Sequence, residues 1–261
     1  MTVAIDPVIF VWQGFALRWY PLIVILSIAV AVLVSRKEAA RQGLPVGVID
    51  DLLPWILPAG LLGARLFHGL DNWNRFAANP LHLLAINEGG LAIYGALIAG
   101  GIAGAVYTRR RGIEFLRMAD VLTPGVLLAL AIGRLAYIIN GDAYGGPTGL
   151  PWGLTYTDPD AFIPATLLGV PTHPYPVYEL LWDSAIFVTV WHLRDRSARL
   201  GGLFLPALAL YATGRFVLTA VRQEPTVLLG LQEAQVVSLV TILTITAVML
   251  SMPTTTPKPQ R

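Results

Sequence analysis

Seven apolar segments, each long enough to cross a lipid bilayer, dominate this sequence. A membrane-spanning helix needs about 17–25 predominantly apolar residues. Seven stretches meet that length and lie at residues 19–35, 52–70, 91–108, 120–139, 177–193, 202–221 and 234–252. The pattern predicts an all-α membrane protein with about seven transmembrane helices.

The composition agrees with a membrane protein rather than a large soluble domain. Charged residues make up 13% of the chain, and the mean hydropathy is +0.64. An average soluble domain is about 25% charged. The chain is therefore too apolar for an ordinary water-soluble core.

Several kinds of active site are excluded by the residues that the sequence lacks. The chain has no cysteine, which excludes disulfides, a thiolate nucleophile and a cysteine-based metal site. Its four histidines show no metal-ligand spacing, so no metal site is predicted. It has no Gly-x-Ser-x-Gly motif and no Walker-type glycine loop. It also has no basic patch suited to nucleic acid, so we expect no nucleic-acid partner.

The placement of lysine and arginine predicts the orientation of the chain. Twelve of these residues lie in the loops after the first, third and fifth segments and in the tail, whereas the opposite loops hold only Arg75 and Arg222. Because cytoplasmic loops carry the excess of positive charge, the N-terminus is predicted outside and the C-terminus inside.

The loops complete the predicted organisation. Residues 1–252 are expected to form a single polytopic membrane domain, and residues 253–261 a flexible tail. Two long outer segments interrupt the apolar pattern. Residues 71–90 are predicted to form an interfacial arm, and residues 141–176 an outer cap, because long loops with their own composition are usually functional or disordered.

Arginines within the apolar segments are the strongest indication of a binding site. Arg65, Arg134 and Arg215 lie toward the outer ends of the second, fourth and sixth segments, and Arg222 follows Arg215 by about two helical turns. A charge at that depth costs a few kcal/mol even on the most lenient scale. Guanidinium groups bind phosphate through paired hydrogen bonds. We therefore expect a phosphate-headgroup site that is open to the bilayer.

The same residues have simpler explanations. Each arginine could pair with a carboxylate or extend to water, and Glu179 inside an apolar run needs a partner of its own. Asn140 and Asp142 could end a helix and form a turn, or face the pocket of Arg134. Tyr20 and Tyr94 could belong to an interfacial aromatic belt. The available carboxylates are Glu88, Asp120, Asp142, Glu179, Asp183 and Glu224.

The sequence also resembles a known family along nearly its whole length. The stretch GRLAYIINGDAYGGPTGLPWG, at 133–153, is similar to the central motif of the prolipoprotein diacylglyceryl transferases. Further similar elements, in the same order, are RWY at 18–20, LLGARL at 61–66, NEGGLAIYGALIAG at 87–100, HPYPVYE at 173–179, and the arginines at 215 and 222.

The resemblance implies a multi-pass enzyme of the bacterial cytoplasmic (inner) membrane. Such an enzyme moves a diacylglyceryl group from phosphatidylglycerol to the lipobox cysteine thiol of a prolipoprotein and releases glycerol phosphate. Its partners are phosphatidylglycerol, the prolipoprotein signal-peptide lipobox and the lipid bilayer, and no cofactor or metal is expected. The resemblance assigns catalysis to Arg134, Arg215 and Tyr94. It assigns substrate binding to Arg134, Tyr20, Arg65, Asn140, Asp142, Glu179 and Arg222.

The departures from the family pattern keep a second hypothesis open. Tyr94 stands where many members have histidine, and Tyr137 where they have asparagine. Asp142 and Thr219 each replace a glutamate, and Tyr175-Pro176 replaces Ser-Gln. The alternative is a catalytically silent, lipid-binding relative. A small-solute transporter is a weaker alternative, because it would predict internal repeats or paired broken helices, and the sequence has neither.

Overall fold

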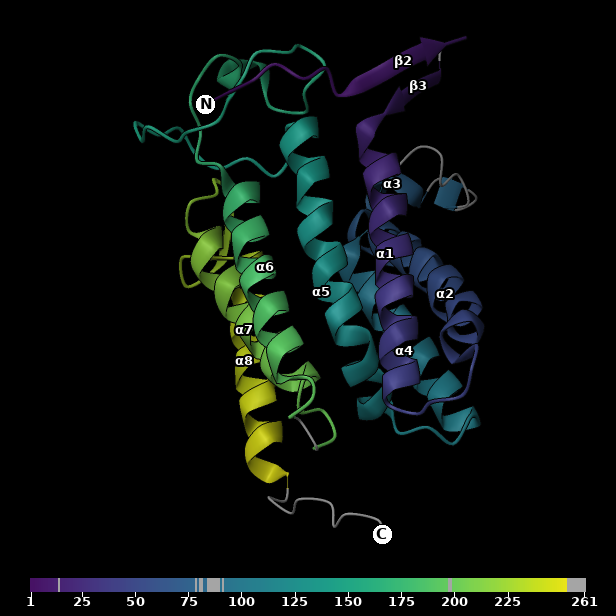
Figure 1. The fold of residues 1–261 in the computed structure, drawn as a ribbon. Coiled ribbons are helices and arrows are strands. Elements are labelled where there is room, and N and C mark those ends of the chain that lie inside the picture. Colours follow the sequence, from purple (N-terminus) through teal and green to yellow (C-terminus); the bar gives the residue numbers. More distant parts are fainter. Residues whose placement is uncertain are drawn as a thin grey trace. The chain divides into compact units, whose positions relative to one another are not determined.

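The structure is a computed structural model, and it describes residues 1–13, 15–77, 79, 82–83, 90, 92–196 and 199–252. Each of the seven predicted segments lies on one long helix (Figure 1). The long helices are α1 (Trp19–Arg41), α2 (Val48–Asp71), α4 (Ile93–Arg110), α5 (Phe115–Asn140), α6 (Tyr175–Leu193), α7 (Phe204–Thr219) and α8 (Glu233–Ser251). The predicted helical character of the chain is therefore confirmed.

The helices have the length and composition expected of a membrane protein. Three of them, α1, α5 and α8, are long and apolar enough to cross a bilayer, and α7 is a shorter apolar helix. Leucine, isoleucine and valine side chains on these helices are exposed in large numbers. Such surfaces are suited to lipid rather than to water.

The fold is mostly helical, and it also contains three pairs of short strands that the sequence did not predict. β1 (Thr2–Val3) pairs in parallel with β4 (Thr155–Tyr156), and β2 (Val8–Trp12) pairs antiparallel with β3 (Phe15–Arg18). β5 (Thr226–Leu228) pairs antiparallel with β6 (Leu231–Gln232). These strands have two to five residues, too few to leave a clear alternating pattern in the sequence.

The chain divides into two compact units, whose boundaries fall inside α1 and α5. One unit is Arg36–Val121, and the other combines Met1–Ser35 with Leu122–Arg261. A single domain over residues 1–252 therefore stays a prediction. Part of the predicted arm at 71–90 and the whole tail at 253–261 lie outside the described residues. Within the arm, the short helix α3 covers Trp73–Phe76.

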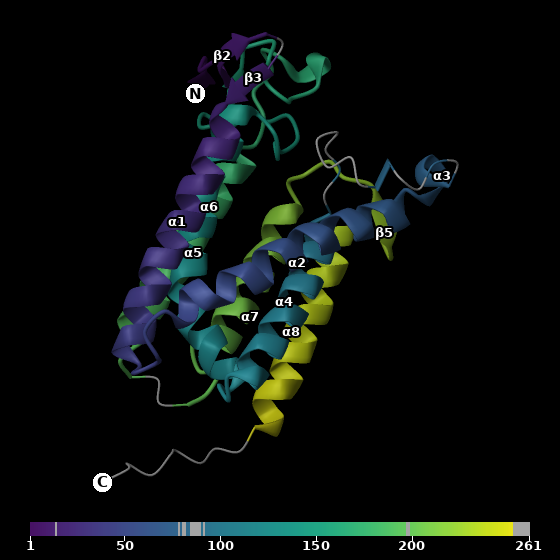
Figure 2. The same cartoon turned by 90° about the vertical axis from the view of Figure 1, so that its right-hand side faces the viewer.

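In the unit Arg36–Val121, α2 packs along α4 (Figure 2). Glycine allows the two backbones to approach closely: a Cβ atom on Gly95 would collide with the carbonyl oxygen of Gly63. Small residues at a crossing point are typical of membrane helix pairs. The Tyr107 hydroxyl adds a buried hydrogen bond of 3.0 Å to the Val48 carbonyl oxygen.

In the other unit, α6, α7 and α8 lie side by side (Figure 1). An apolar cluster joins α5 through Leu127 to α6 through Ile186 and to α7 through Ala207. Gly214 on α7 leaves room for the Trp182 ring, whose Nε1 donates a 3.0 Å hydrogen bond to the Leu210 carbonyl oxygen. This packing fixes the relative positions of the helices that carry the candidate site.

Residues 141–176, which we call the cap, have a small core of their own. The core contains Val3, Leu154, Tyr156, Ala161 and Ile163. The Tyr156 hydroxyl donates a 3.0 Å hydrogen bond to the carbonyl oxygen of Ile138 in α5. The helix gives way to the cap at Gly141, whose φ of 77° favours glycine.

Candidate active site

The candidate site is centred on two arginines and two carboxylates on three packed helices. Arg134 lies on α5, Glu179 and Asp183 on α6, and Arg215 on α7. Residues four apart share one face of a helix, so Glu179 and Asp183 point the same way from α6. We call these four residues the arginine–carboxylate cluster.

Glu179 bridges the two arginines. One carboxylate oxygen, Oε2, lies 2.9 Å from Nη1 of Arg134, and the other, Oε1, accepts a hydrogen bond from Nη1 of Arg215. Asp183 adds a second partner for Arg134, with Oδ2 at 3.2 Å from Nε. A single carboxylate therefore sets the spacing between the two guanidinium groups.

Three of the four cluster residues are almost completely removed from solvent. Arg134, Glu179 and Asp183 are 7%, 3% and 1% exposed. Buried charges of this kind persist only when they are paired. The pairing of arginines with carboxylates, anticipated as the simpler explanation, is thus present.

Pairing leaves part of each guanidinium group available to a ligand. A guanidinium has five N–H donors. Arg134 commits Nη1 and Nε to carboxylates, and Arg215 commits Nη1 within the described part of the chain. The Arg215 side chain also keeps 27% of its surface exposed. Some guanidinium N–H groups of the cluster are therefore not committed to its internal ion pairs.

Arg222 lies beyond the end of α7 and pairs with a carboxylate outside the cluster. Its Nη2 lies 2.5 Å from Oε1 of Glu224, whereas its Nε is buried without a hydrogen-bond partner among the described residues. Its guanidinium carbon is 5.0 Å from the centre of the Tyr175 ring. Arg222 thus presents a buried donor close to the cluster.

Asn140 and Asp142 stand where α5 meets the cap. The Oδ1 atom of each is buried and has no hydrogen-bond partner among the described residues. Burial raises the pKa of Asp142, while the Asn140 side chain and the charge of Arg222 act in the opposite direction. The helix end predicted from sequence is confirmed at Asn140, and both side chains offer buried acceptors.

Tyr20 and Tyr137 form an aromatic pair beside Arg134. Their rings meet edge to face at 5.6 Å, and their hydroxyl oxygens are 3.5 Å apart, which is long for a hydrogen bond. The guanidinium carbon of Arg134 lies 5.5 Å from the centre of the Tyr137 ring. The residue that departs from the family asparagine therefore contacts the central arginine.

Arg65 and Tyr94 belong to the other compact unit, Arg36–Val121. The buried Arg65 donates hydrogen bonds to the carbonyl oxygens of Leu83, His82 and Gly90, at 2.8, 2.7 and 3.2 Å. Tyr94 packs edge to face with Phe67 at 6.4 Å. In this unit the hydrogen bonds of Arg65 therefore tie α2 to the backbone at His82, Leu83 and Gly90.

Two residues of the site were not predicted from the sequence. Asp183 was one of several carboxylates that could meet an arginine, and only its spacing of four residues from Glu179 distinguished it. Tyr175 was noted as a departure from the family pattern, yet its hydroxyl accepts a 2.6 Å hydrogen bond from Arg215. Neither contact between helices has a local signal.

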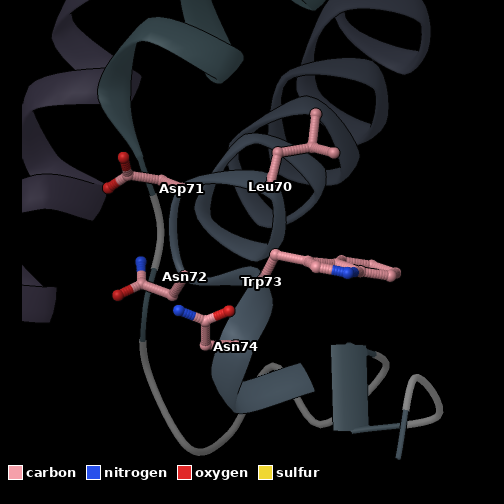
Figure 3. A pocket seen from close by; sticks show the side chains of 5 residues that line it. All are labelled: Leu70, Asp71, Asn72, Trp73 and Asn74. Atoms are coloured by element: carbon pink, nitrogen blue, oxygen red, sulfur yellow. The ribbon is translucent and has the colours of Figure 1, made fainter. Parts of the chain in front are cut away.

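Two other features of the surface lie outside the cluster. A surface pocket at the end of α2 is lined by Leu70, Asp71, Asn72, Trp73 and Asn74 (Figure 3), and none of these is a predicted site residue. Elsewhere, the carboxylates of Asp6, Asp158 and Asp160 lie within 4.8 Å of one another. Largely exposed acidic groups commonly cluster without a cation, so we assign no metal there.

Comparison with known proteins shows the family of this chain. A family model described as prolipoprotein diacylglyceryl transferase matches residues 7–251. The chain belongs to this family. The match extends from β2 to the end of α8, so it includes all of one compact unit, most of the other and every residue of the candidate site.

Individual diacylglyceryl transferases are similar to this chain along most of their length. A phosphatidylglycerol–prolipoprotein diacylglyceryl transferase of Clostridioides difficile is 35% identical over 238 residues, which is 91% of this chain and 92% of that protein. The protein of the same name from Lysinibacillus sphaericus is 33% identical, over 91% of this chain and 89% of its own. That from Gloeobacter violaceus is 36% identical, over 89% and 87%.

Proposed function

We propose that this chain transfers a diacylglyceryl group from phosphatidylglycerol to the lipobox cysteine thiol of prolipoproteins and releases glycerol phosphate. Its membership of the transferase family over residues 7–251 supports this activity, as do the full-length relatives that carry the name. The observation that carries the proposal at the level of the site is the bridge of Glu179 between Arg134 and Arg215.

The reaction places a clear demand on the site. The cysteine sulfur, as thiolate, attacks the carbon of the diacylglyceryl group that is bonded to the phosphate oxygen. A carbon–sulfur bond forms, the carbon–oxygen bond breaks, and its electron pair leaves with glycerol phosphate, while the thiol proton passes to solvent or to the departing phosphate. Negative charge grows on the leaving oxygen, and preorganised donors stabilise it best. We assign this role to Arg134 and Arg215.

Substrate binding is assigned to the residues around the cluster. Arg222 would donate its buried Nε to a phosphate oxygen, and Asn140 and Asp142 would accept hydrogen bonds from the glycerol hydroxyls. Glu179 positions the arginines, and Tyr20 lines the site beside Tyr137. The roles of Arg65 in binding and of Tyr94 in catalysis stay predictions, because both residues lie in the other unit.

The enzyme is proposed to cross the bacterial inner membrane seven times, with its N-terminus and cap outside. The three helices of spanning length and the shorter apolar α7 support this, together with the uneven distribution of lysine and arginine. Because the chain has no cysteine, single cysteines can test it directly. A cysteine in place of Thr157 should react with an impermeant maleimide on intact cells, and one in place of Arg199 should not.

The roles of the two arginines can be tested with lysine substitutions. Arg134→Lys and Arg215→Lys keep the charge but lose the forked donor. Loss of one transition-state donor costs about 10²–10³ in kcat, so we expect losses of about that size in glycerol phosphate release. Arg36→Lys changes an arginine that pairs with Asp50 outside this site, and it should retain activity.

Thermal unfolding of the same purified variants separates catalysis from folding. The assignment requires that the Arg134 and Arg215 variants unfold near the wild-type temperature while turnover falls. Full activity in both variants would remove the two arginines from the mechanism.

A further inference from the structure

Tyr175 is a buried tyrosine that neither the family pattern nor the proposed mechanism uses. It is the first residue of α6, and its side chain is 0% exposed. Its backbone N–H donates a 2.7 Å hydrogen bond to the carbonyl oxygen of His173 in the cap. A tyrosine hydroxyl in such a position needs polar partners.

The hydroxyl finds its partners inside the arginine–carboxylate cluster. It donates to Oε1 of Glu179 at 2.9 Å and accepts from Nη1 of Arg215 at 2.6 Å. Arg215 Nη1 also donates to that same Glu179 oxygen. The three groups form a closed triangle, so the hydroxyl limits the directions in which the Arg215 guanidinium can turn.

The ring of Tyr175 faces cations as well. The guanidinium carbons of Arg222 and Arg215 lie 5.0 and 5.8 Å from its centre, within the range of about 6 Å for cation–π attraction. One side chain therefore contacts both arginines at the end of α7.

Thr219 completes this environment. It is 0% exposed and lies beside the Tyr175 hydroxyl. The family pattern has serine at position 175 and glutamate at position 219. The two departures therefore adjoin in space, and the larger side chain at 175 accompanies the smaller one at 219.

We propose that Tyr175 is a positioning residue of the transferase. Its hydroxyl and ring hold the Arg215 guanidinium so that the remaining N–H groups face the phosphate of the lipid. The inference rests on the proposed function of Arg215.

The test compares Tyr175→Phe with wild type, with a lipobox peptide and phosphatidylglycerol in micelles. Loss of a hydrogen bond to a charged group predicts a fall in kcat of about tenfold or more, with the KM for phosphatidylglycerol nearly unchanged. Because Tyr175 acts through Arg215, Tyr175→Phe should cause no further loss in an Arg215→Lys background. Tyr107→Phe, which removes another buried hydroxyl bond, is the matched control and should leave both constants unchanged.

A second pair of variants tests the match between positions 175 and 219. Tyr175→Ser alone should lose activity, and Tyr175→Ser combined with Thr219→Glu should recover most of the lost kcat, because the new carboxylate accepts from Arg215. This recovery would not follow from a purely structural role for the tyrosine ring.

Three results would overturn the positioning role. They are a wild-type kcat for Tyr175→Phe, an equal loss in the wild-type and Arg215→Lys backgrounds, and a Tyr175→Ser loss that Thr219→Glu does not repair. Absence of glycerol phosphate release from the wild-type protein is a different result, because it would remove the proposed function itself.

Discussion

Glu179 is the residue on which the two central arginines depend most. It holds both Arg134 and Arg215, whereas Asp183 meets Arg134 alone. Removing one partner of a buried ion pair costs about 3–5 kcal/mol. We expect Glu179→Gln to lower the free energy of unfolding by about that amount, and Asp183→Asn by clearly less, because Arg134 then retains Glu179.

Denaturant unfolding of the two purified variants in detergent measures this difference. The charge-neutral replacements have nearly the volume of the originals, so packing is matched. A larger cost for Asp183→Asn than for Glu179→Gln would contradict the bridge.

At this scale the sequence predicted which residues matter better than it predicted their partners. Arg134, Arg215 and Glu179 stood out because a charge in an apolar run demands compensation. The choice of Asp183 and Tyr175 as partners depends on how α5, α6 and α7 pack, and no local pattern encodes that. Arg65 stood out for the same reason, yet it donates hydrogen bonds to backbone carbonyl groups.

Among the elements, the close contact of α2 and α4 depends on a single pair of glycines. A Cβ atom on Gly95 would meet the Gly63 carbonyl oxygen and the Phe67 side chain, whereas one on Gly101 of the same helix meets nothing within 4 Å. Overpacking costs about 1–3 kcal/mol. Gly95→Ala should therefore lower the thermal unfolding midpoint, and Gly101→Ala should leave it unchanged or raise it, since alanine is the better helix former.

Both variants add the same methyl group to α4, so their difference isolates the helix crossing. Equal midpoints for the two would mean that the backbones do not approach as described.

The long helices were predictable because length and hydropathy are local properties. The strands were not predictable, because each has only a few residues or pairs with a strand far away in the sequence. Thr2 of β1 lies opposite Thr155 of β4, a partner that no window of sequence contains. The cap was anticipated from its composition as a segment, and its small core became visible only through this pairing.

For the whole molecule, the sequence motifs and the family match agree on one activity, although the chain carries tyrosines at three family positions, two of which contact the central arginines. Tyr137 contacts Arg134, and Tyr175 contacts Arg215. The arginines are therefore held in a network of carboxylates and tyrosines whose aromatic members differ from the family pattern. The two-unit division was not predicted, because hydropathy reports burial in lipid and not the grouping of helices.

The most direct test of the central claim uses purified protein in phosphatidylglycerol micelles with a peptide that carries one lipobox cysteine. The account predicts release of glycerol phosphate together with an equal amount of peptide whose mass has increased by one diacylglyceryl group, and loss of both in Arg134→Lys. If phosphatidylglycerol binds but neither product forms, the protein is a lipid-binding relative and not a transferase.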